Sequence, residues 1–134
     1  MDWKRYAYIP VGMWLGAMVC TIYVAPRVFR MLGEDQRELA GNVMAGVFLA
    51  VDCFGFVAML IALGASLCSK PRWILSALLG VGAAFSAFYV NPKIVARENI
   101  DFWHGLSTKL WMAMLIGALI LAVLGSPRAK SPAA

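Results

Sequence analysis

The fold is decided by residues 39–67, LAGNVMAGVFLAVDCFGFVAMLIALGASL, which carry a single charged side chain, Asp52. A helix that crosses the ~30 Å hydrocarbon core of a bilayer needs about 20 mostly apolar residues. This run exceeds that length, and its small residues recur at the three- and four-residue spacing of one helix face. The stretch therefore predicts a transmembrane helix.

Three further apolar runs have the length of a membrane span. They cover residues 6–25, 73–90 and 102–124. Long runs of this kind favour helices over a barrel, whose strands alternate over about 10 residues. We therefore expect an all-α integral membrane four-helix bundle, formed by one four-span domain in residues 1–125. Residues 126–134 are a short polar tail with two prolines, which we expect to be disordered.

The composition of the chain is that of a membrane protein. Of its 134 residues, 62% are hydrophobic and 14% are charged, and the mean hydropathy is +0.76. Soluble domains are about 45–50% apolar and about 25% charged, so a water-soluble enzyme, a disordered regulator and a disulfide scaffold are excluded. The net charge of +5 is spread between the apolar runs, which predicts contact with lipid headgroups and not with nucleic acid.

The first and third runs end in similar segments. Residues 23–28, YVAPRV, resemble residues 89–94, YVNPKI. We expect Pro26 and Pro92 to stop their helices, because proline lacks the backbone N–H and clashes with the preceding turn. The similarity indicates either two parallel-repeat helical hairpins or the shared chemistry of a membrane interface. Both interpretations put the two helix exits on one face of the bundle.

Small residues four positions apart predict surfaces for close helix packing. In the first run these are Gly12, Gly16 and Cys20, and similar pairs occur in the second and third runs. In lipid, small residues let two helices approach closely and gain van der Waals contact. We assign Gly12 and Gly16 to packing inside the bundle, with a homodimer seam as the alternative.

Asp52 is the polar residue that stands out. It lies 11 positions after Gly41, which places it about 16 Å along the helix and near mid-membrane. An intramembrane carboxyl usually faces a bundle interior, either as a proton or cation site or as a protonated, hydrogen-bonded group. Trp14 lies at a similar depth and is a candidate donor for the second alternative. Lys109 differs in depth by about 10 Å, so we expect no direct ion pair.

The fourth run opens with a polar helix face. His104, Ser107 and Thr108 follow the spacing i, i+3 and i+4, and Trp111 continues that face. An imidazole with two hydroxyls can bind a small polar ligand or relay protons, and His104 is a weak candidate metal ligand. Alternatively, the face forms interhelical hydrogen bonds near the membrane interface, with Asn42 of the second run as a partner.

Several kinds of chemistry lack their residues in this chain. A bis-histidine haem needs two histidines, and the chain has one. Cys20, Cys53 and Cys68 form no Cys-x-x-Cys pair, and the scattered methionines are typical of apolar cores rather than of copper sites. We therefore expect no enzyme and no cofactor, haem included, although a bound lipid or pigment would suit such a bundle.

Short motifs along the chain carry a family resemblance: WLG at residues 14–16, APRVF at 25–29, AG at 40–41 with Phe48, NP at 91–92, and Phe102, His104 and Ser107. Together they resemble the DUF4149 or TMEM205-like group of small four-helix membrane proteins, over roughly residues 12–124. The resemblance implies four spans and no established enzymatic activity. It also implies a more distant similarity to CopD-like copper-resistance proteins and to haem-linked four-span oxidases. Ala7 stands where the first-span histidine of those haem-linked relatives is expected, which argues against haem.

Two hypotheses about function follow. The first is a non-catalytic accessory or scaffold subunit that packs against other integral membrane subunits and lipids. The alternative is a small polytopic protein that binds or transports a metal ion or small solute through Asp52 and the His104 face. Either protein can form homo-oligomers.

We expect a multi-pass protein of the bacterial inner membrane with both termini in the cytoplasm. Lysines and arginines number six on the side of the termini and five on the other side. The positive-inside rule therefore favours this orientation only slightly.

Overall fold

The computed structural model describes residues 6–125, which are almost wholly helical. Residues 1–5 and the predicted disordered tail, 126–134, lie outside the described residues. The helices are α2 (Ile9–Leu32), α3 (Arg37–Ala65), α4 (Lys70–Phe85), α5 (Asn91–Val95) and α6 (Ile100–Gly125), joined by a 3₁₀-helix, η1 (Glu34–Gln36), and a π-helix, η2 (Ser86–Val90). No strand occurs between residues 6 and 125, so the all-α prediction is confirmed.

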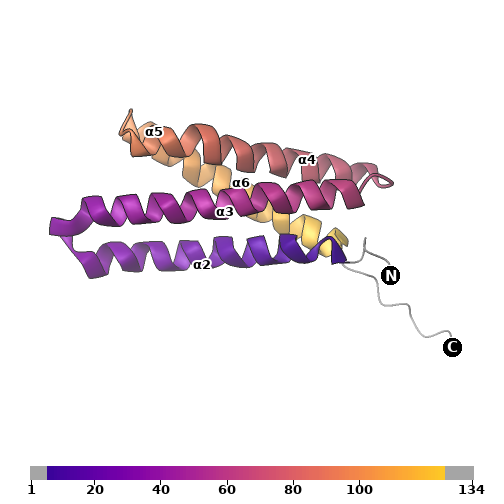
Figure 1. The fold of residues 1–134 in the computed structure, drawn as a ribbon, viewed down its shortest axis with the longest axis horizontal. Helices are drawn as coiled ribbons and strands as arrows, with labels where there is room; N and C mark the ends of the chain where they lie inside the picture. The colour runs from indigo at the N-terminus through magenta and orange to yellow at the C-terminus, as the bar shows by residue number, and fades with distance from the viewer. Residues whose placement is uncertain (1–5, 126–134) are drawn as a thin grey trace.

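Within residues 6–125, four helical segments are long and apolar enough to cross a membrane: Ile9–Leu32, Glu34–Ala65, Lys70–Val95 and Ile100–Leu124. Consecutive segments run antiparallel, and each of α2, α3, α4 and α6 packs against two others around a common core (Figure 1). The start of α2 and the end of α6 therefore lie at one end of the molecule. The predicted four-helix membrane bundle is confirmed.

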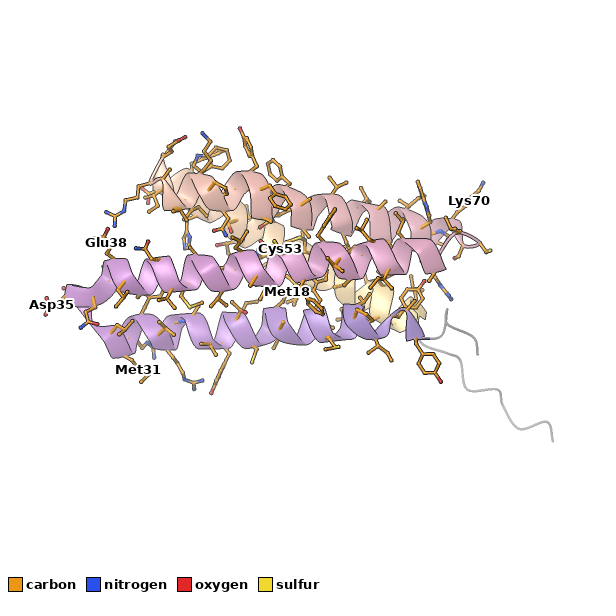
Figure 2. The ribbon with its side chains drawn as sticks, viewed as in Figure 1. Met18, Met31, Asp35, Glu38, Cys53 and Lys70 are labelled. Carbon is orange, nitrogen blue, oxygen red and sulfur yellow. The ribbon has the colours of Figure 1, made fainter. Side chains whose placement is uncertain are left out.

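Charged residues lie at both ends of the bundle. Asp35 and Glu38 lie at the end where α2 turns into α3, and Lys70 lies at the opposite end (Figure 2). At the end where α2 turns into α3, Arg97 pairs with Glu38 at 3.0 Å, and Lys93 pairs with Glu98 at 2.5 Å. Exposed pairs of this kind are worth at most about 1 kcal/mol, so packing between the helices holds the bundle together.

The expectation that Pro26 ends the first helix is wrong. α2 continues through Pro26 to Leu32. It ends at Gly33, whose φ of +71° belongs to the region that glycine adopts without strain. Pro26 is exposed, so its ring fits without displacing a neighbouring helix. Membrane helices tolerate a missing hydrogen bond of this kind through small local adjustments of the backbone.

Pro92 does not end its helix either. The chain continues through α5 to Val95, and the π-helix η2 precedes the proline. The N–H of Asn91 bonds to the carbonyl of Ser86, five residues back. The hydrogen-bond ladder is therefore rearranged just where the N–H of Pro92 is missing. Pro92 falls in the first turn of α5, a position that proline occupies readily.

The two similar segments, residues 23–28 and 89–94, lie at the same end of the bundle, as expected (Figure 1). Their local structures differ. The first is regular α-helix, in which the guanidinium of Arg27 lies 3.5 Å from the centre of the Tyr23 ring, whereas the second begins in the π-helix. A duplication of helical hairpins therefore stays a prediction.

The core is built from one face of each long helix. α2 contributes Val11, Trp14 and Met18, which are fully buried. Met18 points between the helices, whereas Met31 points away from the bundle (Figure 2) and is 86% exposed. Methionine thus serves here both as core filler and as an outward-facing residue.

The assignment of Gly12 and Gly16 to packing inside the bundle is wrong. Both glycines are exposed, as is Cys20. No atom lies within 4 Å of a Cβ placed at either glycine. Each residue of an α-helix turns about 100° from the last, so these three residues fall on the side of α2 opposite Trp14 and Met18.

Candidate functional site

Asp52 lies near the middle of α3 and is 1% exposed. The buried positions of α3 that flank it, Met44, Gly55 and Met59, follow helical spacing and face the centre of the bundle. The carboxyl therefore points into the protein and not toward lipid.

Ser86 provides the hydrogen bond that Asp52 receives. Its Oγ donates to Oδ2 of Asp52 over 2.5 Å, and Ser86 itself is 2% exposed. Ser86 is the first residue of η2. Single π-helical turns often occur at functional sites, because the extra residue changes where side chains point. The π-helix η2 therefore both rearranges the backbone hydrogen bonds before Pro92 and places the Ser86 hydroxyl at Asp52.

Trp14 approaches the site from α2. Its indole ring lies against the backbone of α3 at Gly55, one turn after Asp52. A Cβ at residue 55 would fall 2.6 Å from Cζ2 of Trp14 and closer still to Cε2 and Nε1. Only glycine leaves room for the ring at this position. The Nε1 group of Trp14 is buried without a hydrogen-bond partner.

Trp111 approaches from α6. Its ring packs edge-on against Phe48, with 4.6 Å between ring centroids, and Phe48 lies one turn before Asp52 on α3. The indole N–H of Trp111 therefore comes near the carboxyl of Asp52. No hydrogen bond joins them, and Nε1 of Trp111 and Oδ1 of Asp52 are both buried without a partner.

The prediction that Trp14 donates a hydrogen bond to Asp52 is only partly correct. Trp14 lies at the predicted depth, but Ser86 makes the hydrogen bond. Neither Ser86 nor Gly55 was expected at this site from the sequence.

The predicted polar face of α6 is split by the fold. Trp111 is buried and Ser107 is half-buried, whereas His104 and Thr108 are exposed. Thr108 donates to the carbonyl of His104 at 2.9 Å, within its own helix. Asn42, the expected partner, is exposed, and the interhelical amide bond comes instead from Asn91, whose Nδ2 donates to the carbonyl of Ala45 at 3.1 Å.

The residues 6–125 hold no group of three His, Cys, Asp or Glu side chains that could bind a metal ion. His104 therefore belongs to no such group. Asp52 and the exposed part of the His104 face do not meet, since one is interior and the other lies on the surface.

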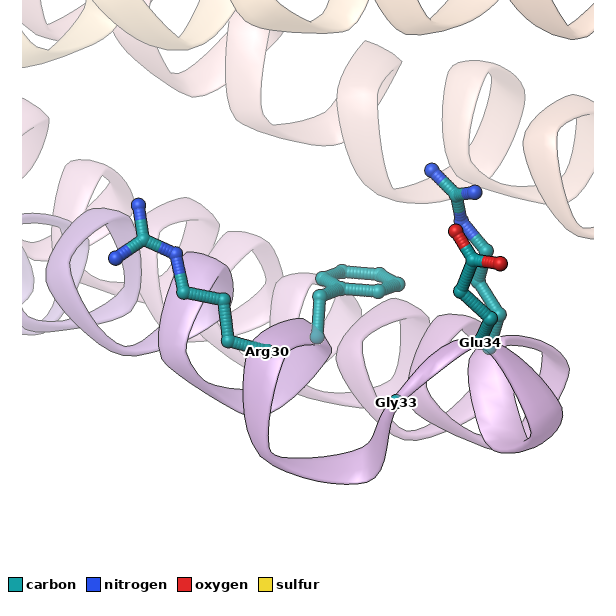
Figure 3. A pocket seen from close by; sticks show the side chains of 5 residues that line it. Arg30, Gly33 and Glu34 are labelled. Atoms are coloured by element: carbon teal, nitrogen blue, oxygen red, sulfur yellow. The ribbon is translucent and has the colours of Figure 1, made fainter.

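A shallow hollow at the turn from α2 to α3 is lined by Phe29, Arg30, Gly33, Glu34 and Arg37 (Figure 3). It is open and of mixed charge. Arg37 precedes Asp52 by 15 positions, which is about 22 Å along the helix. The hollow is therefore separate from the buried polar groups.

The model of a family described as "Domain of unknown function (DUF4149)" matches residues 10–102. This range is more than half of the chain, and it includes Trp14, Asp52 and Ser86 but not Trp111. No curated protein and no solved structure matches the chain. The similarity to TMEM205-like and CopD-like proteins stays a prediction.

Proposed function

The chain belongs to the DUF4149 family, and from this premise and its four membrane-length helices we propose that it is a non-catalytic accessory subunit of a larger membrane complex. It docks against a transmembrane helix of another subunit through the outer face of α2. We define this α2 face by the exposed residues Ile9, Gly12, Gly16, Cys20 and Tyr23.

The single observation that carries this proposal is the outward position of Gly12 and Gly16. Nothing lies within 4 Å of a Cβ at either glycine, so the bundle itself makes no use of their small size. Glycine destabilises a helix interior by about 1 kcal/mol relative to alanine. In lipid, a pair of glycines four residues apart lets another helix approach closely enough for van der Waals packing.

The rest of the α2 face suits the same partner. Ile9 and Tyr23 are large, exposed residues at either end of the glycine pair. They lie on the same stripe of α2 as the glycines, before and after them along the helix axis, and they offer large side chains for contact with a neighbouring helix. Lipids would cover the same face in the absence of a partner.

Replacing both Gly12 and Gly16 with leucine is expected to detach the chain from its complex. The added side chains keep a second helix at a distance, while the bundle has free space at both positions. We expect wild-type protein extracted in a mild detergent to run with its partner subunit, and the double variant to run at the size of the single chain. Size-exclusion chromatography with multi-angle light scattering measures this difference.

Gly46→Leu is the matched control, because Gly46 is also exposed, on α3, with nothing within 4 Å of a Cβ. It should leave the association unchanged. A wild-type chain that runs alone, or a loss of association in the control equal to that in the double variant, would contradict the proposal. A complex that contains two copies of this chain only would identify the α2 face as a homodimer seam instead.

We also place this subunit in the bacterial inner membrane with both termini in the cytoplasm. An even number of crossings puts both ends of the bundle domain on one side of the bilayer. The alternative function, transport of a metal ion or solute through Asp52 and His104, would need both groups on one path, yet Asp52 is buried and His104 is exposed.

A further inference from the structure

Each of the four spans contributes one polar side chain to a cluster in the middle of the bundle. Trp14 comes from α2, Asp52 from α3, Ser86 from η2 and Trp111 from α6, and all four are at most 4% exposed. We call these residues the central cluster. No two of them belong to the same span, so the cluster exists only in the assembled bundle.

The central cluster contains buried polar atoms that the protein leaves unpaired. They are Oδ1 of Asp52 and Nε1 of Trp14 and of Trp111. An unpaired buried polar group costs about 1–3 kcal/mol. The two indole N–H groups are donors, and Oδ1 of Asp52 accepts when the carboxyl is ionised and can donate when it is protonated. All three atoms lie around α3 between Phe48 and Gly55.

This set of atoms selects the chemistry of its ligand. A metal cation would face two indole N–H groups, and an anion would face a carboxyl. A water molecule both donates and accepts hydrogen bonds. It can therefore accept from an indole N–H, and it can either donate to Oδ1 of the ionised carboxylate or accept from the Oδ1–H group of the protonated carboxyl. Buried waters in proteins usually satisfy polar groups in this way.

We propose that the central cluster is a hydrated proton-binding site, in which a water molecule between Oδ1 of Asp52 and the indole N–H of Trp111 lets the Asp52 carboxyl exchange its proton with the outside. Ser86 fixes the other carboxyl oxygen, and Trp14 covers the side of the cluster that faces α2. The site is independent of the docking face, since Gly12 and Gly16 lie on the opposite side of α2.

The charge of the central cluster changes when the Asp52 carboxyl gains or loses its proton. The side chains that act on it are the Ser86 hydroxyl from η2 and the Trp111 indole from α6, and the Trp14 indole from α2 lies one turn away, against Gly55. The nearest titratable residue on α3 is its neighbour Cys53, which is half-buried. Neither ion pair among the described residues involves Asp52, and no charged side chain acts on its carboxyl.

Infrared spectroscopy of the protein in lipid bilayers tests this proposal. A protonated carboxyl has a C=O stretching band that moves to lower frequency when its proton is replaced by deuterium. At acidic or neutral pH we expect such a band in the wild type and its loss in Asp52→Asn. After transfer into D₂O, the band should shift within minutes. Asp101→Asn, a change at an exposed carboxyl, is the matched control and should keep the band.

Two further variants keep the test decisive if Asp52→Asn does not fold. Ser86→Ala removes the hydrogen bond to Oδ2 and should move the frequency of the band. Trp111→Phe keeps a ring against Phe48 but removes the N–H, and it should slow the deuterium shift several-fold. The proposal is overturned if no Asp52-dependent carboxyl band occurs at any pH, or if the band stays unshifted in D₂O for a day.

Discussion

Gly55→Val is expected to lower the free energy of unfolding of the bundle by about 3 kcal/mol. The new side chain would overlap the indole ring of Trp14, beginning with a Cβ only 2.6 Å from Cζ2. Neither residue can move away easily, because residue 55 is held in the backbone of α3 and Trp14 is fully buried in the core. We therefore expect α2 to separate from α3, with a lower melting temperature in mild detergent.

Gly46→Val provides the control for this experiment. It is the same change on the same helix, but Gly46 is exposed and a Cβ there meets nothing within 4 Å. Its effect should stay within about 0.5 kcal/mol, as for other surface substitutions. Equal melting temperatures for the two variants would show that Trp14 does not pack against Gly55.

Trp14→Ala is the second large effect that we expect, at about 3 kcal/mol. The substitution removes the largest fully buried side chain and leaves a cavity between α2 and α3. In lipid the loss comes from van der Waals contact rather than from hydrophobic transfer, because the unfolded helices stay in an apolar solvent. Trp73→Ala, at a residue that is 44% exposed, should cost less than about 1 kcal/mol.

The double variant, Trp14→Ala with Gly55→Val, separates this explanation from a general loss of stability. Once the indole is gone, the valine has room, so the two changes should cost clearly less together than the sum of their separate costs. Residues in contact typically show such coupling, whereas distant residues add. Costs that add to within about 0.5 kcal/mol would contradict the contact. The measurement is a double-mutant cycle on unfolding free energies.

The fold could be predicted from the sequence because the bilayer imposes a simple length rule. Four apolar runs of about 20 residues allow little else than four helices. The helix ends were harder to predict. Pro26 and Pro92 look like stop signals, but a helix in or near lipid keeps its hydrogen bonds if it can, and Gly33 ends α2 instead.

The candidate site was predictable only in part. Asp52 stands out because a carboxyl is rare in an apolar run. Its position along the second run places it at a depth in the membrane similar to that of Trp14 in the first run. Ser86 is a common residue in a helix, and nothing in its own spacing reveals its bond to Asp52. The outward position of Gly12 and Gly16 was missed because small-residue spacing predicts close packing without saying which neighbour provides it.

The outer surface of this bundle should face hydrocarbon, and two of its free cysteines allow a test. Cys20 is exposed on the α2 face in mid-span, and Cys68 is exposed in the turn between α3 and α4. The measurement is the rate at which a charged, water-soluble thiol reagent, present on both sides of the membrane, labels each cysteine of the purified protein in vesicles. We predict rapid labelling of Cys68 and none of Cys20 until the protein is denatured. Labelling of Cys20 in intact vesicles as fast as that of Cys68 would show that this face of α2 lies in water and that the bundle does not span the membrane.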